Sequence, residues 1–236
     1  TSATPDQVRT VFGRKRTVPV GIEFGTVGVL DDAGVMHEIT TFRRDVRTDG
    51  RHAEVELGGS IDDDLSRRDF TINAIAFSPT SGEIRDPFDG RGDLTRKIVR
   101  AVGVAADRMR EDRLRALRAI RFASRYGFEI EKRTLEAITE SAPHLTRLSG
   151  ERVRQEIEKT MDQVAAPSGA FAMWRSTGAA AVLVPELTQG GEAERAVDCA
   201  ARPGLARKPG RRLVRLAVLC SDVPPKSILD AAMRLR

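Results

Sequence analysis

SRRDFTINAIAF, residues 66–77, places two arginines, an aspartate and an asparagine beside an apolar run. Ser60 is a good helix N-cap with Asp63 three residues later, so we predict a short helix over 61–68 and a strand over FTINAIAF. Residues 67–69 then lie at a helix-to-strand junction, where side chains can converge on a cleft. The spacing alone favours ordinary solvated charges at a helix end; an anion-binding site is the alternative.

The anion-binding alternative gives each polar residue of this stretch a task. Arg67 and Arg68 would hold a triphosphate through forked, charge-assisted hydrogen bonds. Asp69 and Asn73 would reach a ribose or fix the arginines in place. The stretch would then form the entrance of a nucleotide pocket.

The composition indicates a globular chain that permits a polyanionic partner. The 236 residues are 40% hydrophobic and 31% charged, with a net charge of +5. Most of the basic residues are arginines, which favours planar contacts to phosphates or bases. We expect no signal peptide and no membrane span, because no stretch approaches the ~18 apolar residues that a span needs. The two cysteines and three histidines lack metal-ligand spacing, so we expect a reducing cytoplasm and no zinc.

The sequence pattern changes near residue 94. Before it, VGIEFGTVGVL and VMHEITTF flank DDAG and predict a β-hairpin, and AIAFSPTSGEIRDPF predicts two short strands around a turn. After residue 104, the spacing predicts one helix up to Gly127, then helices over EKRTLEAITESA and SGERVRQEIEKTMDQV, the last with Ser149 as N-cap. Shorter Ala-rich helices follow from residue 166. We predict an α+β fold, with a β-rich head over 1–93, a helical neck over 94–160 and a helical body over 161–236.

A second polar cluster lies in MREDRLRALRAIRF. On one helix, Glu111, Arg115 and Arg118 share a face, and Asp112 neighbours Arg115. Exposed ion pairs that staple a helix are common and contribute little, and the spacing alone favours that interpretation. The alternative is a base-reading edge, in which the acid accepts from the exocyclic amine of cytosine or adenine and the guanidinium donates to a ring nitrogen. Uracil and guanine present the opposite groups.

A third cluster, DPFDGRGDL over 86–94, has three aspartates among glycines. It is not a calcium loop, because the twelfth position counted from Asp86 is Lys97 rather than an acid. We predict a tight, structured turn with a hinge.

The chain as a whole resembles the bacterial class II CCA-adding enzyme and poly(A) polymerase family of nucleotidyltransferases. The resemblance runs in family order across roughly the first 160 residues, through TSATPDQV, VGIEFGTV, EITTFR, DGRH, SIDDDLSRRDFTINAIAF, DPFDGRGDL, IVRAVG, REDRLRALRAIRFASRYGF and ERVRQEIEK. It implies a polymerase-β-like head followed by an all-helical neck and body. It also implies transfer of CMP and AMP from CTP and ATP to a tRNA 3′ end.

The resemblance also assigns roles to individual residues. RRDFTINA is similar to the family's triphosphate- and ribose-binding motif, which implies those roles for Arg67, Arg68, Asp69 and Asn73. EDRLR is similar to its amino-acid template, which implies base reading by Glu111, Asp112 and Arg115, with Arg118 also binding the nucleotide.

Metal binding is where the chain departs from the family pattern. Family members carry a GG…RD…DxD segment just upstream of TSATP, and its two aspartates hold catalytic Mg²⁺. This chain starts at Thr1, so we expect an incomplete head, with the DxD segment lost or supplied by a preceding segment or a second chain. Glu38 is similar to the third acidic residue of that platform, or is an exposed strand residue. We assign no metal ligand and expect Thr1–Arg236 alone to add no nucleotide.

Two functional classes stay open at this point. One is an enzyme that adds CCA, with A-only addition or poly(A) tailing as variants; the other is a catalytically incomplete fragment that binds nucleotide and RNA. The C-terminal body is short for the family. Residues 202–221 hold six basic side chains and no acids, which suits RNA phosphates or a solvated loop equally.

Overall fold

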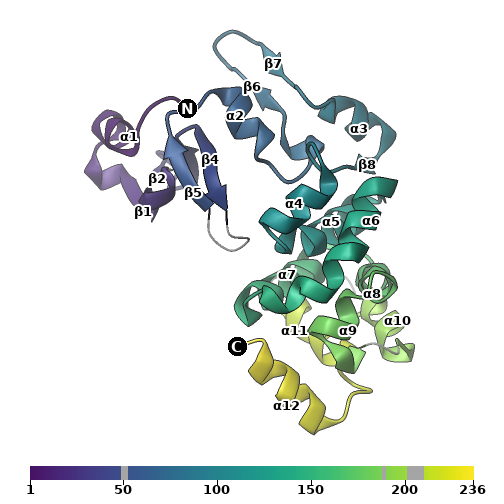
Figure 1. Cartoon of the computed structure of the whole chain (residues 1–236). Helices are drawn as coiled ribbons and strands as arrows, with labels where there is room; N and C mark the ends of the chain where they lie inside the picture. Colours follow the sequence, from purple (N-terminus) through teal and green to yellow (C-terminus); the bar gives the residue numbers. More distant parts are fainter. Residues whose placement is uncertain (49–52, 188–189, 201–209) are drawn as a thin grey trace.

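The computed structural model describes residues 1–48, 53–187, 190–200 and 210–236, with side chains left out over 44–55. The strands and the first, short helices lie at one end of the molecule and the later helices at the other, which confirms the predicted α+β order (Figure 1). The strands are β1 (Thr17–Gly21), β2 (Thr26–Leu30), β3 (Met36–Thr40), β4 (Arg43–Thr48), β5 (Ala53–Leu57), β6 (Ala76–Phe77), β7 (Ile84–Arg85), β8 (Ile98–Val99) and β9 (Glu129–Ile130).

Helices account for most of the remaining elements. The α-helices are α1 (Pro5–Phe12), α2 (Ile61–Ser66), α3 (Gly90–Arg96), α4 (Ala105–Glu111), α5 (Leu114–Tyr126), α6 (Lys132–Ser141), α7 (Gly150–Gln163), α8 (Pro167–Ser176), α9 (Ala179–Leu183), α10 (Glu192–Cys199), α11 (Gly210–Leu219) and α12 (Pro225–Arg234). Short 3₁₀ turns are η1 (Arg14–Arg16), η2 (Ile22–Phe24), η3 (Thr71–Asn73), η4 (Ala142–Arg147) and η5 (Pro185–Leu187).

The first sheet has the antiparallel order β1-β2-β3, which confirms the hairpin predicted around DDAG. Alternate residues of β2 face opposite sides, so Val27 and Val29 pack with Val8 of α1 in a small core. Gly28 faces the other side, directly opposite Glu38 of β3. The backbone N–H of Phe42 donates to the carbonyl of Thr1, so the start of the chain lies beside the end of this sheet.

The predicted helix after Ser60 is present, but the predicted strand after it is wrong. Ser60 and Asp63 form a full capping box on α2, and the helix ends at Ser66. Residues 71–73 then form the turn η3, and only Ala76–Phe77 is a strand. The side-chain amide of Asn73 donates to the carboxylate of Asp69. A local side-chain hydrogen bond of this kind competes with regular secondary structure, so the apolar pattern does not produce a strand here.

The DPFDG segment forms the predicted turn and then starts a helix that the sequence analysis does not predict. Asp86 accepts the backbone N–H groups of Gly90 (2.7 Å) and Arg91 (2.9 Å), which caps the first turn of α3. Asp93 on α3 is buried and accepts the hydroxyl of Thr71 (2.6 Å). The DPFDGRGDL segment therefore holds η3 in place through the hydrogen bond between Thr71 and Asp93.

The single long helix predicted up to Gly127 is also wrong, because it is two helices. Asp112 has an extended backbone (φ −148°, ψ 106°) between α4 and α5. Its carboxylate accepts the N–H of Leu114, the first residue of α5 (3.0 Å). An aspartate that bonds to the backbone competes with helix continuation in this way.

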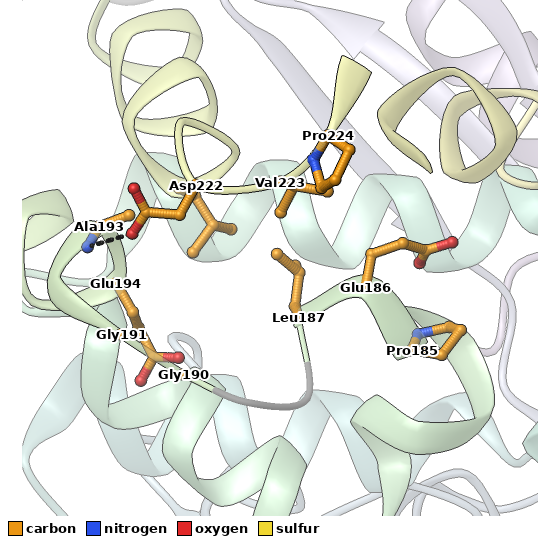
Figure 2. A pocket seen from close by; sticks show the side chains of 11 residues that line it. Pro185, Glu186, Leu187, Gly190, Gly191, Ala193, Glu194, Asp222, Val223 and Pro224 are labelled. Carbon is orange, nitrogen blue, oxygen red and sulfur yellow. Dashed lines mark hydrogen bonds between the residues drawn. The ribbon is translucent and has the colours of Figure 1, made fainter. Parts of the chain in front are cut away.

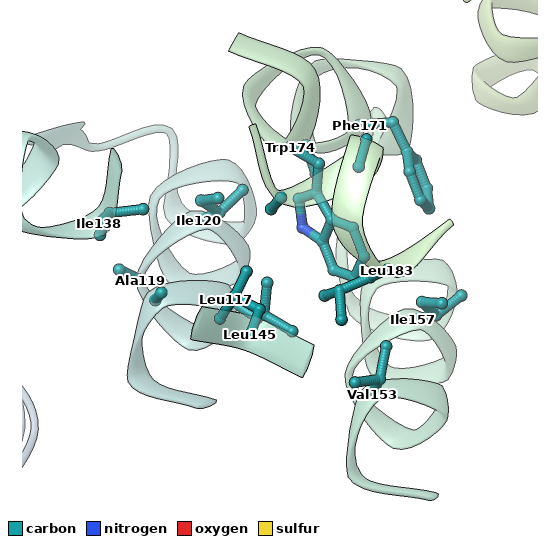
Figure 3. Packing of buried hydrophobic residues seen from close by; sticks show 14 of the residues in the cluster. Leu117, Ala119, Ile120, Ile138, Leu145, Val153, Ile157, Phe171, Trp174 and Leu183 are labelled. Atoms are coloured by element: carbon teal, nitrogen blue, oxygen red, sulfur yellow. The ribbon is translucent and has the colours of Figure 1, made fainter. Parts of the chain in front are cut away.

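The main core lies among the helices and extends into the head. Trp174, Leu117, Ile120 and Leu145 are among its buried side chains (Figure 3). Phe70, from the stretch that opens the sequence analysis, belongs to the same core. This core contains residues from both sides of position 93/94. The predicted domain boundaries at 93/94 and 160/161 stay predictions.

The helices after residue 166 are short, as predicted. Ser149 occupies the N-cap position of α7 without a side-chain hydrogen bond to the helix. Arg215 is buried and donates to the carbonyls of Met161 (2.7 Å) and Val164 (2.9 Å) at the end of α7, so it is not available to RNA phosphates. Arg202, Arg207, Lys208 and the DGRH motif lie outside the described residues. In the part of the chain that the structure describes, no helix is long and apolar enough to cross a membrane.

Candidate functional site

A pocket of about 480 Å³ lies between the end of α2 in the head and the start of α5 in the helical part. Five arginines and two aspartates are among the residues that line it, so its charge suits a polyanion. Seven of the nine sequence-predicted site residues meet here with two that were not predicted. The lining residues are Arg43, Arg67, Arg68, Asp69, Asn73, Asp112, Arg115, Arg118 and Phe122.

Arg68 is held at the pocket by an acid that the sequence analysis overlooks. Its Nη2 lies 2.7 Å and its Nε 3.2 Å from Oδ2 of Asp64, one helical turn earlier on α2. Asp64 is buried, whereas about half of the Arg68 side chain is exposed. This pair orients the guanidinium and leaves its outer edge accessible to an anion.

Asp69 joins the head to α5. Its Oδ2 accepts from Arg118 Nε (2.8 Å) and Nη2 (2.7 Å), and its Oδ1 accepts from the amide of Asn73 (2.9 Å). Its side chain is only 10% exposed. Asp69 therefore holds Arg118 and Asn73 in place, rather than the predicted partners Arg67 and Arg68.

Asp112 lies at the break between α4 and α5 and is held from two sides. Besides capping α5, its Oδ2 accepts from Arg152 Nη2 of α7 (2.8 Å). A carboxylate has about four lone-pair sites, so it can accept a further N–H from a base. Asp112 also lines the pocket.

Arg115 fastens the helical part to the head. It donates to Glu111 Oε2 (2.7 Å), to the carbonyl of Arg108 (3.1 Å) and to the carbonyl of Arg67 (3.1 Å). Arg108 in turn contacts Glu111 and donates to the carbonyl of Ser66 (3.2 Å). Glu111 is not among the pocket-lining residues, so its carboxylate orients the two arginines that clasp the end of α2.

Arg43 and Phe122 are the lining residues that sequence reasoning missed. Arg43 begins β4 and donates to the carbonyl of Phe24 (2.6 Å). Phe122 packs partly against the main core, and it follows Arg115 and Arg118 by seven and four positions, so it shares their face of α5. That spacing was a signal that could have placed Phe122 at the site; Arg43 offered none beyond its position in EITTFR.

Glu38 lies on β3, exposed to solvent and outside the pocket lining. Mg²⁺ prefers several oxygen ligands, usually including carboxylates. Within residues 1–48, 53–187, 190–200 and 210–236, no three His, Cys, Asp or Glu side chains are grouped to hold a metal. No metal ligand is therefore assigned among the described residues.

A second hollow of about 320 Å³ lies among the C-terminal helices (Figure 2). It is lined by three carboxylates, and each already has a protein partner. Glu186 pairs with Arg234 (2.7 Å), Glu194 with Arg175, and Asp222 accepts a backbone N–H at the start of α10 (3.2 Å). These contacts join η5, α8, α10 and α12, so we interpret this hollow as a feature of helix packing.

Two family models match the chain in order. Residues 1–100 match the poly A polymerase head domain, and residues 127–190 match a probable RNA and SrmB-binding site of polymerase A. A CCA-adding enzyme of Lactiplantibacillus plantarum is 48% identical over 166 residues, which cover 68% of this chain and 39% of that protein. One of Limosilactobacillus fermentum is 44% identical over 178 residues, 73% of this chain and 43% of that protein. The chain thus spans about two fifths of the length of these curated relatives.

Solved structures give the same answer at the level of the fold. The Bacillus stearothermophilus CCA-adding enzyme in complex with CTP has a TM-score of 0.73 and 35% identity, covering 98% of this chain and 58% of that one. A CCA-adding enzyme with ATP has a TM-score of 0.72 at 25% identity, covering 98% and 54%. The two family models, the curated relatives and the solved structures all agree. The chain belongs to the poly(A) polymerase and CCA-adding enzyme family of nucleotidyltransferases.

Proposed function

We propose that this chain supplies the nucleotide-selecting part of a tRNA nucleotidyltransferase that adds CMP and AMP, from CTP and ATP, to the tRNA 3′ end. The observation that carries the proposal is that one pocket is lined both by an arginine clamp, Arg67 and Arg68, and by the Asp112–Arg115 pair. A nucleoside triphosphate has the matching polarity, with anionic phosphates at one end and a hydrogen-bonding base at the other.

The arginine clamp, Arg67 and Arg68, suits the triphosphate. Arg67 and Arg68 follow each other at the end of α2, and Asp64 holds Arg68 with its outer edge accessible. Arginine forks bind phosphate oxygens in pairs, so the same clamp serves CTP and ATP equally.

The Asp112–Arg115 pair suits a base with an exocyclic amine. Asp112 can accept from the amine of cytosine or adenine, and Arg115 can donate to the neighbouring ring nitrogen. Three of the five N–H groups of Arg115 are engaged by described residues, which fixes its plane. Uracil and guanine would place an acceptor against Asp112 and a donor against Arg115, so both are disfavoured.

The partners and setting follow from the family rather than from the pocket. Relatives of this chain are named CCA-adding enzymes, and similar proteins have been solved with CTP and with ATP. We therefore infer tRNA as the acceptor and the cytoplasm as the compartment, in keeping with the free thiols of Cys199 and Cys220. Mg²⁺ is part of this proposal as a requirement of the family.

Nucleotide titration tests the clamp directly. Arg68→Ala is expected to weaken CTP and ATP alike, by about 1.5–3 kcal/mol for a charge-assisted contact, with a smaller loss at high salt. Arg16→Ala is the matched control, because Arg16 pairs with Asp32 on the exposed surface of the head. Normal nucleotide binding by Arg68→Ala, together with a lower unfolding temperature, would return the clamp to a structural role.

The choice of reaction is tested on the acceptor. With the upstream DxD segment supplied as a fusion or as a separate peptide, labelled CMP and AMP incorporation should be measured on tRNA that ends before its CCA, with CTP alone, ATP alone and both. CCA addition requires CMP incorporation from CTP alone, followed by AMP when ATP is added. Incorporation of AMP only, or of long A tracts, would favour the A-adding or poly(A) alternatives.

A further inference from the structure

A row of aromatic rings leads away from the nucleotide pocket along α5. Phe122 lines the pocket, and Tyr126 stacks on it nearly in parallel, with ring centroids 6.0 Å apart and planes 6° apart. Phe128 continues the row beyond the end of the helix, 5.7 Å from Tyr126. The row therefore runs from a pocket-lining residue to the C-terminal end of α5, where Tyr126 is exposed and Phe128 is partly buried against the main core.

Arginines accompany the rings along the same helix. The guanidinium of Arg118 lies 5.4 Å from the Phe122 ring centroid, and that of Arg125 lies 5.1 Å from the Tyr126 ring centroid. Arg125 is steadied by a hydrogen bond to Gln163 of α7 (2.9 Å). Rings and cations thus alternate on one face of α5, because positions three and four apart lie on the same face.

This combination is the usual chemistry of single-stranded nucleic-acid binding. Unpaired bases stack on aromatic rings, and neighbouring guanidinium groups meet the phosphates. Tyr126 is suited to that contact because 47% of it is exposed, although it is a large aromatic residue in a stacked row. A ring that served only to pack the helix end would be expected to bury more of its surface.

We propose that the single-stranded 3′ end of the acceptor RNA stacks on Tyr126, with Arg125 at its phosphates. Transfer requires the RNA 3′ end to lie beside the bound nucleotide, and the row begins at Phe122, which lines the pocket. The inference rests on the proposed function, since it names the residues that receive the acceptor of that reaction.

The test compares two labelled RNA hairpins, one with a short single-stranded 3′ end and one with a blunt end. Tyr126→Leu keeps an apolar side chain against Phe122 but removes the ring, and is expected to weaken binding of the overhang hairpin by about 5- to 100-fold. Tyr126→Phe should bind it like the wild type. Phe77→Leu is the matched control, because Phe77 is 62% exposed on β6 and lies outside the pocket lining.

The outcomes separate the inference from the proposed function. Support requires that Tyr126→Leu loses the overhang hairpin selectively, while its affinities for the blunt hairpin and for CTP stay at the wild-type values. Equal losses for both hairpins, no loss, or a wild-type protein that binds CTP but no RNA would overturn the inference alone. A wild-type protein that binds neither CTP nor RNA would overturn the proposed function as well.

Discussion

Asp112 is the residue whose position says most about base choice. Its Oδ2 accepts from Arg152 on α7 and its Oδ1 from the backbone of α5, so the carboxylate is fixed before any base arrives. A preorganised acceptor discriminates better than a mobile one, because less rotamer freedom is lost on binding. Arg152 is therefore expected to support selectivity without touching the nucleotide.

Asp112→Ala should reduce discrimination against UTP and GTP more than it reduces triphosphate affinity. A hydrogen-bonded contact to a base edge contributes about 1–3 kcal/mol of discrimination, and the arginine clamp is untouched by this change. Competition titrations with the four nucleotides measure it. Asp107→Ala is the matched control, since Asp107 pairs with Arg110 on the exposed side of α4. If Asp112→Ala keeps the wild-type order of preference among the four nucleotides, Asp112 and Arg115 stabilise the helices and do not select the base.

Local sequence was sufficient for some site residues and insufficient for others. Arg67, Arg68, Asp69 and Asn73 are adjacent in sequence, and the fold needs only one helix end and one turn to bring them together. Arg152 lies 40 residues from the Asp112 that it holds, so no local pattern could pair them.

At the scale of elements, α3 and η3 are pressed together at Gly90. A methyl group on Gly90 would lie 2.2 Å from the carbonyl oxygen of Thr71, which is backbone and cannot rotate away. Gly90→Ala is therefore expected to lower the free energy of unfolding by at least about 1–3 kcal/mol, the usual cost of overpacking. Nucleotide affinity should fall too, because η3 carries Asn73.

Gly169→Ala is the control for Gly90→Ala, measured in the same urea titration. Gly169 lies within α8 with open space around the added methyl group, so the change should stabilise the protein by about 0.5–1 kcal/mol. Equal effects of the two substitutions would show that the contact between α3 and η3 is not tight in solution.

Asp93 gives the same contact a pH dependence. Burial acts to raise the pKa of its carboxyl group, but hydrogen bonds from Thr71, Arg96 and Arg100 outweigh it and hold the pKa below its usual value. A lowered pKa in the folded state means stability that is present above the unfolded pKa, near ~3.9, and lost as the pH falls through the folded value.

Asp93→Asn should therefore destabilise the protein most at neutral pH. The difference in free energy of unfolding between wild type and Asp93→Asn is expected to narrow as the pH falls from about 5 towards about 3. Urea titrations across this range measure it. Asp62→Asn is a suitable comparison, because its partner Arg85 is half exposed and the pair should contribute little at any pH. A difference that stays constant with pH would exclude ionisation of Asp93 as its source.

Sequence patterns predicted the wrong secondary structure for two elements in which a polar side chain forms a hydrogen bond with a nearby residue. The strand over 70–77 and the long helix up to Gly127 both follow from apolar spacing, and both are interrupted at an aspartate or asparagine. Asp69 and Asp112 are also pocket residues, so the departures from regular structure coincide with the site.

At the scale of the whole molecule, the order of a β-rich head and a helical remainder was predictable, because hydrophobic spacing changes period near residue 94. The distribution of the core was not predictable. Phe70 and Val99 pack with the helices, whereas Val8, Val27 and Val29 form a separate core beneath the first sheet. Which apolar residues share a core depends on tertiary contacts that a linear pattern does not record.

The core of the first sheet is separate from the helical core, which predicts two separable unfolding events, and Trp174 reports only the unfolding of the helical core. It is the single tryptophan, 2% exposed within the helical core. Leu117→Ala removes a neighbour from that core and should lower the midpoint of the Trp174 fluorescence transition, at a cost of about 2–5 kcal/mol. Val27→Ala opens a cavity in the small core of the first sheet and should leave that midpoint unchanged while shifting part of the circular dichroism transition. Equal shifts of the Trp174 midpoint in both variants would mean that head and helices unfold as one cooperative unit, held together by the contacts of Arg108 and Arg115 with the end of α2.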